Sequence, residues 1–173
     1  MPRLIPPIVA PGTMAGASQP RIDGDGLVLR PFDAGDAGMV QEAFGDPGIQ
    51  RWHFRSIDTL GEAAAWIEVA AEGWRTERSA NWAIVDRADA VAEGPVGRIA
   101  LTQVDLAGGW GEVSYWMLPE HRGRGVASRA VAALSDWALG ALGLHRLELK
   151  HSTANPASCR VALSLVSEPP TYN

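Results

Sequence analysis

The most constraining feature of the sequence is a glycine–arginine turn between a strand-like and a helix-like segment. The turn reads HRGRGVASRA over residues 121–130. Before it, GWGEVSYWML over residues 109–118 alternates polar and apolar side chains as a strand does. After Gly125, apolar residues recur at helical spacing at Val126, Ala130, Leu134, Trp137 and Ala141, and Gly143 stands where a C-cap is expected. The chain must therefore run from a strand through a flexible turn directly into a helix.

A strand, turn and helix in this order predict an anion site. Backbone N–H groups at the start of the helix would point outward at the positive end of its dipole. The two glycines of the turn allow the backbone to approach a phosphate closely, and Arg122, Arg124 and Arg129 can add charge-assisted hydrogen bonds. Pyrophosphate is the natural ligand. A surface turn that needs glycine for its geometry and arginine for solubility explains the same residues, and this alternative stays open.

Two known phosphate-binding patterns fit the turn less well. A Walker loop requires Lys followed by Ser or Thr after its last glycine, and no such pair follows Gly125. The dinucleotide pattern comes closer, because Gly123 and Gly125 have its first spacing and Glu148 lies about 20 residues further on. Ser128 replaces the third glycine, however, and PEHR separates the strand from the turn. A Rossmann turn is tighter, so a nicotinamide-nucleotide enzyme is the weaker interpretation.

The remaining segments alternate between strand and helix signals. Strand patterns occur around Leu27 and Leu29, at residues 81–86, at 96–105 and at 144–150. Helix starts are indicated by Asp33, by a capping box of Thr59 with Glu62, and by Asn155 followed by Pro156. Because three strands follow one another through short loops, we predict an α+β (mixed α/β) fold with a central, mostly antiparallel sheet flanked by helices.

Length and composition fit one domain and exclude several classes of protein. The chain has 173 residues, 46% of them hydrophobic, with a formal net charge of −5 and a pI of about 5.3. An acidic chain is not a general nucleic-acid or membrane-surface binder, and no segment reaches the roughly 18 apolar residues of a membrane helix. A single cysteine, Cys159, cannot form an intrachain disulfide, which suits the cytoplasm. We expect no metal site.

Prolines and glycines set the predicted domain boundaries. They interrupt the apolar run at the N-terminus, so we predict a disordered leader over residues 1–26. The folded domain is expected over residues 27–163. An irregular tail is expected over residues 164–173.

Several segments together resemble one family. RGRGVA at 122–127 matches an Arg/Gln-x-x-Gly-x-Gly/Ala loop, and LRPF, GEVSYWMLPEHRGRG, LGLHRLELK and NPASCRVAL occur in the family's order. The chain is thereby similar to the GNAT superfamily of acyl-CoA-dependent N-acyltransferases, in particular to the Rim-type branch of ribosomal-protein N-terminal acetyltransferases. The resemblance covers Leu27 to Leu163. It implies acetyl-CoA as cosubstrate and an amine as acceptor, either the N-terminal α-amine of a protein or a small-molecule amine.

The resemblance also implies roles for individual residues. The loop that would hold the CoA pyrophosphate comprises Arg122, Gly123, Arg124, Gly125, Val126 and Ala127. The strand backbone that would pair with the pantetheine arm belongs to Trp116, Met117 and Leu118, where nearby N–H groups could also polarise the thioester carbonyl. Asn155 would bond the pantetheine chain, and Ser158 would protonate the leaving thiolate. The alternative for Asn155 and Ser158 is a helix cap and a surface serine.

The sequence says less about the catalytic base and the acceptor pocket than about the cofactor loop. Keeping a lysine amine neutral at pH 7 costs about 4 to 5 kcal/mol, whereas an α-amine costs only about 1 kcal/mol. Glu112 is the candidate base, because alternation places it on one strand face with Ser114 and Trp116. An ion pair of Glu112 with a neighbour is equally consistent. Trp52, His53 and Phe54 could line the acceptor pocket or simply close the core.

The C-terminal sequence departs from the family. After Val161 the family continues into two further strands, whereas this chain reads ALSLVSEPPTYN, which cannot supply them. We therefore predict a sheet that lacks the last two strands. Its last strand would have an open edge, able to pair with another chain in a dimer. These features leave two functions open: an N-acetyltransferase, whose activity the truncation could impair, and an inactive acyl-CoA-binding protein.

Overall fold

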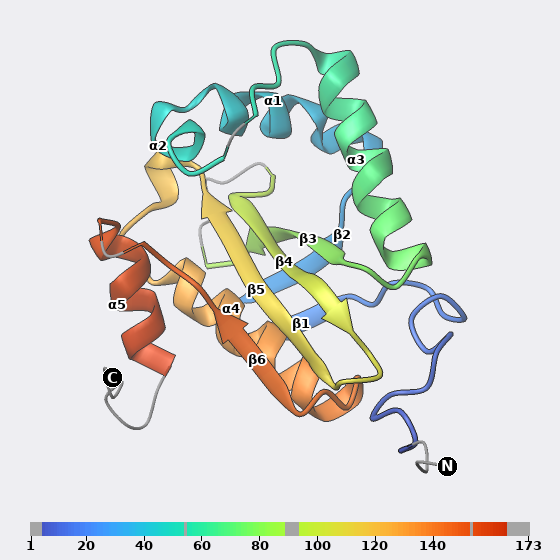
Figure 1. Cartoon of the computed structure of the whole chain (residues 1–173). Helices are drawn as coiled ribbons and strands as arrows, with labels where there is room; N and C mark the ends of the chain where they lie inside the picture. The colour runs from blue at the N-terminus through green and yellow to red at the C-terminus, as the bar shows by residue number, and fades with distance from the viewer. Residues whose placement is uncertain (1–4, 54, 89–93, 153, 166–173) are drawn as a thin grey trace.

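A six-stranded sheet in sequential order forms the centre of the molecule (Figure 1). The computed structural model describes residues 5–53, 55–88, 94–152 and 154–165. The strands are β1 (Ile22–Gly24), β2 (Leu27–Pro31), β3 (Ala80–Asp86), β4 (Gly97–Asp105), β5 (Trp110–Met117) and β6 (Arg146–Leu149). All neighbours from β1 to β5 are antiparallel, and β6 pairs with β5 in parallel. The predicted α+β fold with a mostly antiparallel sheet is confirmed.

Five helices and three short helical turns complete the described part of the fold. The helices are α1 (Ala37–Gly45), α2 (Pro47–Gln50), α3 (Leu60–Arg75), α4 (Val126–Asp136) and α5 (Pro156–Leu165). The turns are η1 (Ala34–Asp36), η2 (Pro119–His121) and the π-helical η3 (Trp137–Ala141). Within the described residues, no helix has the length and apolar character that a bilayer span requires.

Local capping explains where the helices begin. The Thr59 side chain accepts from the Glu62 N–H and the Glu62 carboxylate accepts from the Thr59 N–H, so the predicted capping box is confirmed. Asp33 caps as predicted, but it forms its box with Asp36 on η1 and not directly on α1. Gly143, after η3, has the positive φ of +86° expected of a glycine that ends a helix.

The strands divide the core between two faces of the sheet. Side chains such as Trp82, Ile99 and Val113 pack with α4 in the larger apolar cluster. On the other face, Trp116 and Leu118 join α1 and α3 in a smaller cluster, which includes Phe44. Because strand side chains alternate, neighbours along β5 contact opposite helices.

The prediction of a disordered leader is wrong for the part of it that the structure describes. Val9 and Met14 are buried in the main cluster, and β1 pairs with β2 within the range assigned to the leader. The Glu77 carboxylate accepts hydrogen bonds from the N–H groups of Gly12, Met14 and Ala15. Prolines exclude a helix there, but they do not prevent an extended segment from packing on the core.

The last strand of the described chain lies at the edge of the sheet. β6 contacts β5 on one side only, and the chain continues from it through residues 150–155 into α5. In Figure 1 the chain leaves the C-terminal end of β6 through a loop and enters α5, which contacts α4. The sequence assigned to an irregular tail, residues 164–173, falls largely outside the described residues.

Candidate active site

A cleft opens where β5 and β6 part. Their parallel pairing runs from Trp110 with Arg146 to Val113 with Leu149 and ends there. Beyond it, Ser114–Met117 stay paired with β4 on the other side. In the described part of the chain, no β6 residue stands opposite this stretch of β5. A cleft of about 880 Å³ occupies the space between β5, the turn before α4, the chain after β6 and α5.

The glycine–arginine turn forms one end of this cleft. Gly123 and Gly125 have φ of +75° and +73°, a backbone region that other residues rarely adopt, and Gly125 is the N-cap of α4. A Cβ built on either glycine would meet no atom within 4 Å, so the turn faces open space. A phosphate can therefore approach the backbone of the turn closely at the start of α4.

The three arginines of this segment differ in their contacts and in their position relative to the cleft. Arg122 lines the cleft, where its Nε donates to the Met117 carbonyl and its Nη2 to the Asp46 carboxylate. Arg129 points away, bonding the Asp25 carbonyl and the Asp86 carboxylate, so the expectation that it contacts a phosphate is wrong. Arg124 is exposed and does not line the cleft.

The other predicted cofactor residues lie close by, with one exception. Trp116, Met117, Val126, Ala127 and Asn155 line the cleft together with the glycines of the turn. Leu118 is not part of the cleft lining; it is buried in the cluster with α1 and α3. These positions are consistent with the predicted roles and leave the roles themselves as predictions.

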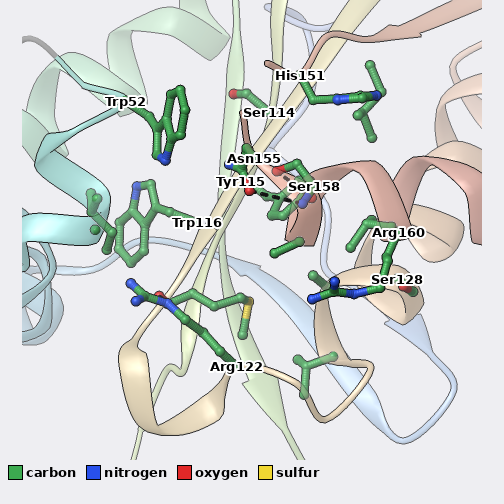
Figure 2. A pocket seen from close by; sticks show the side chains of 18 of the residues that line it. Trp52, Ser114, Tyr115, Trp116, Arg122, Ser128, His151, Asn155, Ser158 and Arg160 are labelled. Carbon is green, nitrogen blue, oxygen red and sulfur yellow. Dashed lines mark hydrogen bonds between the residues drawn. The ribbon is translucent and has the colours of Figure 1, made fainter. Parts of the chain in front are cut away.

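Ser158 is held by two neighbours inside the cleft. Its backbone N–H donates to the Asn155 side-chain oxygen at 3.2 Å, so Asn155 is the helix cap that Pro156 was expected to follow. Its hydroxyl accepts a hydrogen bond from the Tyr115 hydroxyl at 3.1 Å, marked in Figure 2. Burial raises the pKa of Tyr115, opposed by the bond to Ser158, so the phenol stays protonated at neutral pH.

Sequence reasoning missed Tyr115. The residue stands in the SYW run, on the strand face opposite Glu112 and Ser114, and the sequence pattern assigns no role to that face. Its partner is 43 residues away, on a helix reached only after β6. Only the pairing of β5 with β6 brings the two hydroxyls together.

Glu112, the predicted base, lies beside the cleft and not in its lining. Its carboxylate binds Lys150 Nζ at 2.7 Å and accepts a weaker bond from Gln103 at 3.3 Å. The hydrogen bond to Glu112 raises the pKa of Lys150, which also lies 3.5 Å from Glu148. The ion-pair alternative is therefore realised in this structure, and the catalytic role of Glu112 stays a prediction.

The predicted acceptor residues lie across the cleft from α5. Figure 2 shows Trp52 and Trp116 on one side and His151 and Arg160 on the other. Trp52 and His53 line the cleft, and Phe54 lies outside the described residues. Burial, and secondarily the charge of Arg98, lowers the pKa of His53, so its imidazole is neutral at pH 7.

A buried arginine on the same side was also missed. Arg98 on β4 is 8% exposed and bonds Asn81 and Ser114. The signal was present in the sequence, because a charged residue interrupts the apolar strand VGRIALT. Its significance depends on Asn81 and Ser114, which the sheet brings to it from the two neighbouring strands.

Comparisons with known proteins define the class. The sequence matches the family described as "Acetyltransferase (GNAT) domain" over residues 26–165, and the chain therefore belongs to the GNAT family of acetyltransferases. Acetyl-CoA is the acyl donor of this family. The fold, the parted strands and the glycine turn agree with this assignment.

Relatives and solved structures agree on the fold. The chain is 27% identical to the uncharacterized N-acetyltransferase YoaA of Bacillus subtilis (strain 168), over 84% of this chain and 81% of YoaA. A putative ribosomal-protein-serine acetyltransferase from Vibrio cholerae is 22% identical, with a TM-score of 0.71 over 83% of this chain and 80% of that one. RimL, a ribosomal L7/L12 α-N-protein acetyltransferase solved with coenzyme A, is 16% identical, with a TM-score of 0.70 over 84% and 82%.

Proposed function

We propose that this chain transfers an acetyl group from acetyl-CoA directly to a primary amine, with the N-terminal α-amine of a protein as the favoured acceptor. The observation that carries this proposal is the parting of β5 and β6 beside the glycine turn. One cleft thereby joins a backbone anion site, an unpaired strand edge and a hydroxyl pair. RimL acts on a protein α-amine, which supports this acceptor class.

Some residues of the cleft would bind acetyl-CoA, and others would transfer protons. The N–H groups from Gly123 to Ala127 would bind the pyrophosphate of acetyl-CoA. The backbone of β5 beyond Val113, which has no β6 residue opposite it in the described chain, would pair with the pantetheine amides. As the acetyl carbon bonds the amine nitrogen, its bond to sulfur would break, and Ser158 would give a proton to the departing thiolate. Tyr115 would reprotonate Ser158, and the proton that the amine nitrogen loses would return to this hydroxyl pair through water.

An α-amine acceptor needs little help from a catalytic base. Such an amine needs only about 1 kcal/mol to be neutral at pH 7, against about 4 to 5 kcal/mol for lysine. Glu112, acting through water, would then supply a modest contribution. The neutral His53 adds no positive charge to the cleft wall that would repel an arriving ammonium.

Titration calorimetry with acetyl-CoA, followed by an assay of CoA release, tests this function. We expect saturable binding of acetyl-CoA and none of NADH, then CoA release with N-terminal peptides and, more slowly, with lysine-like amines. Arg124→Glu is expected to weaken acetyl-CoA binding through charge repulsion. Tight binding without release in the presence of any amine would replace the transferase by the acyl-CoA-binding alternative.

A further inference from the structure

Arg98 is a buried cation whose neighbours are neutral. Its Nε and Nη2 donate to the Asn81 side-chain oxygen at 2.8 and 2.6 Å, and its Nη1 donates to the Ser114 hydroxyl at 3.3 Å. The guanidinium also lies 5.7 Å from the centroid of the Trp66 ring. Among residues 5–53, 55–88, 94–152 and 154–165, no carboxylate forms an ion pair with it.

Another arginine of the sheet, Arg30, has a carboxylate as its counter-ion and serves as a comparison. Arg30 on β2 makes a two-pronged contact with the Asp36 carboxylate at 2.8 and 2.7 Å, and this hydrogen bonding raises the pKa of Arg30. Burial lowers the pKa of Arg98 to about 10, which still leaves it charged at neutral pH. A buried charge without a counter-ion is costly, so a purely structural position would favour an apolar residue.

The cation lies directly behind the wall of the cleft. Ser114 lines the cleft, and its hydroxyl is the contact between the cleft and the guanidinium. Arg98 stands opposite Trp116 in the β4–β5 register, so the two side chains share a sheet face. The Trp116 indole Nε1 is buried and has no hydrogen-bond partner among the described residues. Figure 2 shows Trp116 on the same side of the cleft as Trp52, with Ser114 between that side and His151.

The described titratable groups near this wall provide no counter-ion for Arg98. Glu112, two residues from Ser114, is engaged by Lys150. Burial keeps His53 neutral, and the charge of Arg98 adds to that effect. A guanidinium has five N–H donors, and only three hydrogen bonds from Arg98 are made within the described chain. Directly behind the wall there is therefore a positive charge with N–H groups for which the described residues supply no acceptor.

We propose that Arg98, Ser114 and Trp116 form a subsite for a carboxylate carried by the amine acceptor. The inference rests on the proposed function and narrows its substrate class to amines with a carboxylate near the reacting nitrogen. A carboxylate that accepts from the Ser114 hydroxyl supplies the missing counter-charge, because Arg98 donates to that same hydroxyl. It can come from a short free amino acid or from Asp or Glu at the start of a peptide, and the two sources share this chemistry.

Paired acceptors that differ by one negative charge test the subsite. One arm compares β-alanine with β-alaninamide, and the other compares peptides that begin Ala-Glu with peptides that begin Ala-Gln. CoA release is measured as kcat/KM at equal concentrations of neutral amine. We expect the carboxylate member to be favoured about tenfold in at least one arm, because a charged hydrogen bond replaces a neutral one. The arm that responds identifies the source.

Variants assign the preference to Arg98. In Arg98→Met, which keeps the length but removes the charge, the preference is expected to fall below about twofold; Arg98→Lys should keep part of it. Arg75→Met on the exposed end of α3 is the matched control and should keep the full preference. Equal rates within both pairs in an active wild-type enzyme, or an unchanged preference in Arg98→Met, would overturn the proposal.

A binding measurement separates this proposal from the function on which it rests. Propionate and propionamide are added to the CoA-loaded wild-type protein at constant ionic strength, and the unfolding temperature is recorded. We expect propionate alone to raise it, because a ligand that binds only the folded state stabilises that state. This result holds even if no amine is acetylated or if Arg98→Met fails to fold. Equal shifts with the two compounds would reject the subsite.

Discussion

The two faces of the central sheet are built from different side chains. Under α4 the strands present a continuous apolar surface that includes Trp82, Ile99 and Val113. Under α1 and α3 the same strands present Asn81, Arg98 and Ser114, and the apolar cluster there draws on few strand residues. The first face supplies burial, which stabilises the fold. The second carries buried polar groups that cost stability, and the proposed carboxylate subsite would explain their presence.

The largest expected effect is the loss of stability when a large side chain is removed from the apolar face under α4. Trp82 is fully buried, packs against Trp74 and Trp137, and donates to the Pro20 carbonyl. Trp82→Ala should lower the free energy of unfolding by about 3 to 5 kcal/mol, measured by urea denaturation. Val69→Ala, at an exposed position of α3, is the control and should change little. A loss below about 1 kcal/mol would contradict the assignment of stability to this face.

Turnover should depend on the hydroxyl groups of Tyr115 and Ser158, which lie in the cleft. Ser158→Ala is expected to lower kcat about 100-fold, the range of a lost general acid, with KM for acetyl-CoA nearly unchanged. Tyr115→Phe should cost less, and the double variant should be no worse than Ser158→Ala, because the two hydroxyls act in series. Steady-state kinetics decide this. Strictly multiplicative losses, or a pure rise in KM, would assign both residues to packing.

The glycine turn should control affinity with little effect on the core. Gly125→Val places a branched side chain at a φ of +73°, which costs about 1 to 2 kcal/mol of backbone strain and covers the N–H groups at the start of α4. Acetyl-CoA affinity should therefore fall at least about tenfold in calorimetry. Gly38→Ala in α1, where the added methyl meets no atom within 4 Å, is the matched control. Unchanged affinity in Gly125→Val would exclude this turn from cofactor binding.

The smallest expected effect tests the base. Glu112→Gln should lower turnover only a few-fold at pH 7 and recover at alkaline pH, since an α-amine requires about 1 kcal/mol of deprotonation. Glu148→Gln is the control, because Glu148 also lies beside Lys150 and stands opposite Glu112 in the β5–β6 register. The pH profile of kcat/KM is the measurement. Identical profiles for both variants would leave Glu112 as an ion-pair residue alone.

What the sequence predicted correctly is mostly local. The capping box of Thr59 and Glu62 acts within one helical turn, and the cap at Asn155 depends only on the residues that follow it. The glycine turn before α4 is equally short-range. Such signals are readable because the interacting groups are neighbours in the chain.

What it missed depends on distant partners. Tyr115 meets Ser158 across 43 residues, and Glu77 binds backbone that precedes it by more than 60 residues. Arg98 finds its hydrogen-bond partners only when β3 and β5 lie on either side of β4. In each case the partner is set by the tertiary arrangement of the chain, which periodicity alone does not specify.

The packed N-terminal segment has a practical consequence for anyone who expresses this protein. Met14 is fully buried and Glu77 accepts hydrogen bonds from the N–H groups of Gly12 and Met14. Translation begun at the Met14 codon would therefore remove Val9 from the core and the Gly12 hydrogen bond from Glu77. Ile5 is largely exposed, so an affinity tag joined ahead of it leaves these contacts intact.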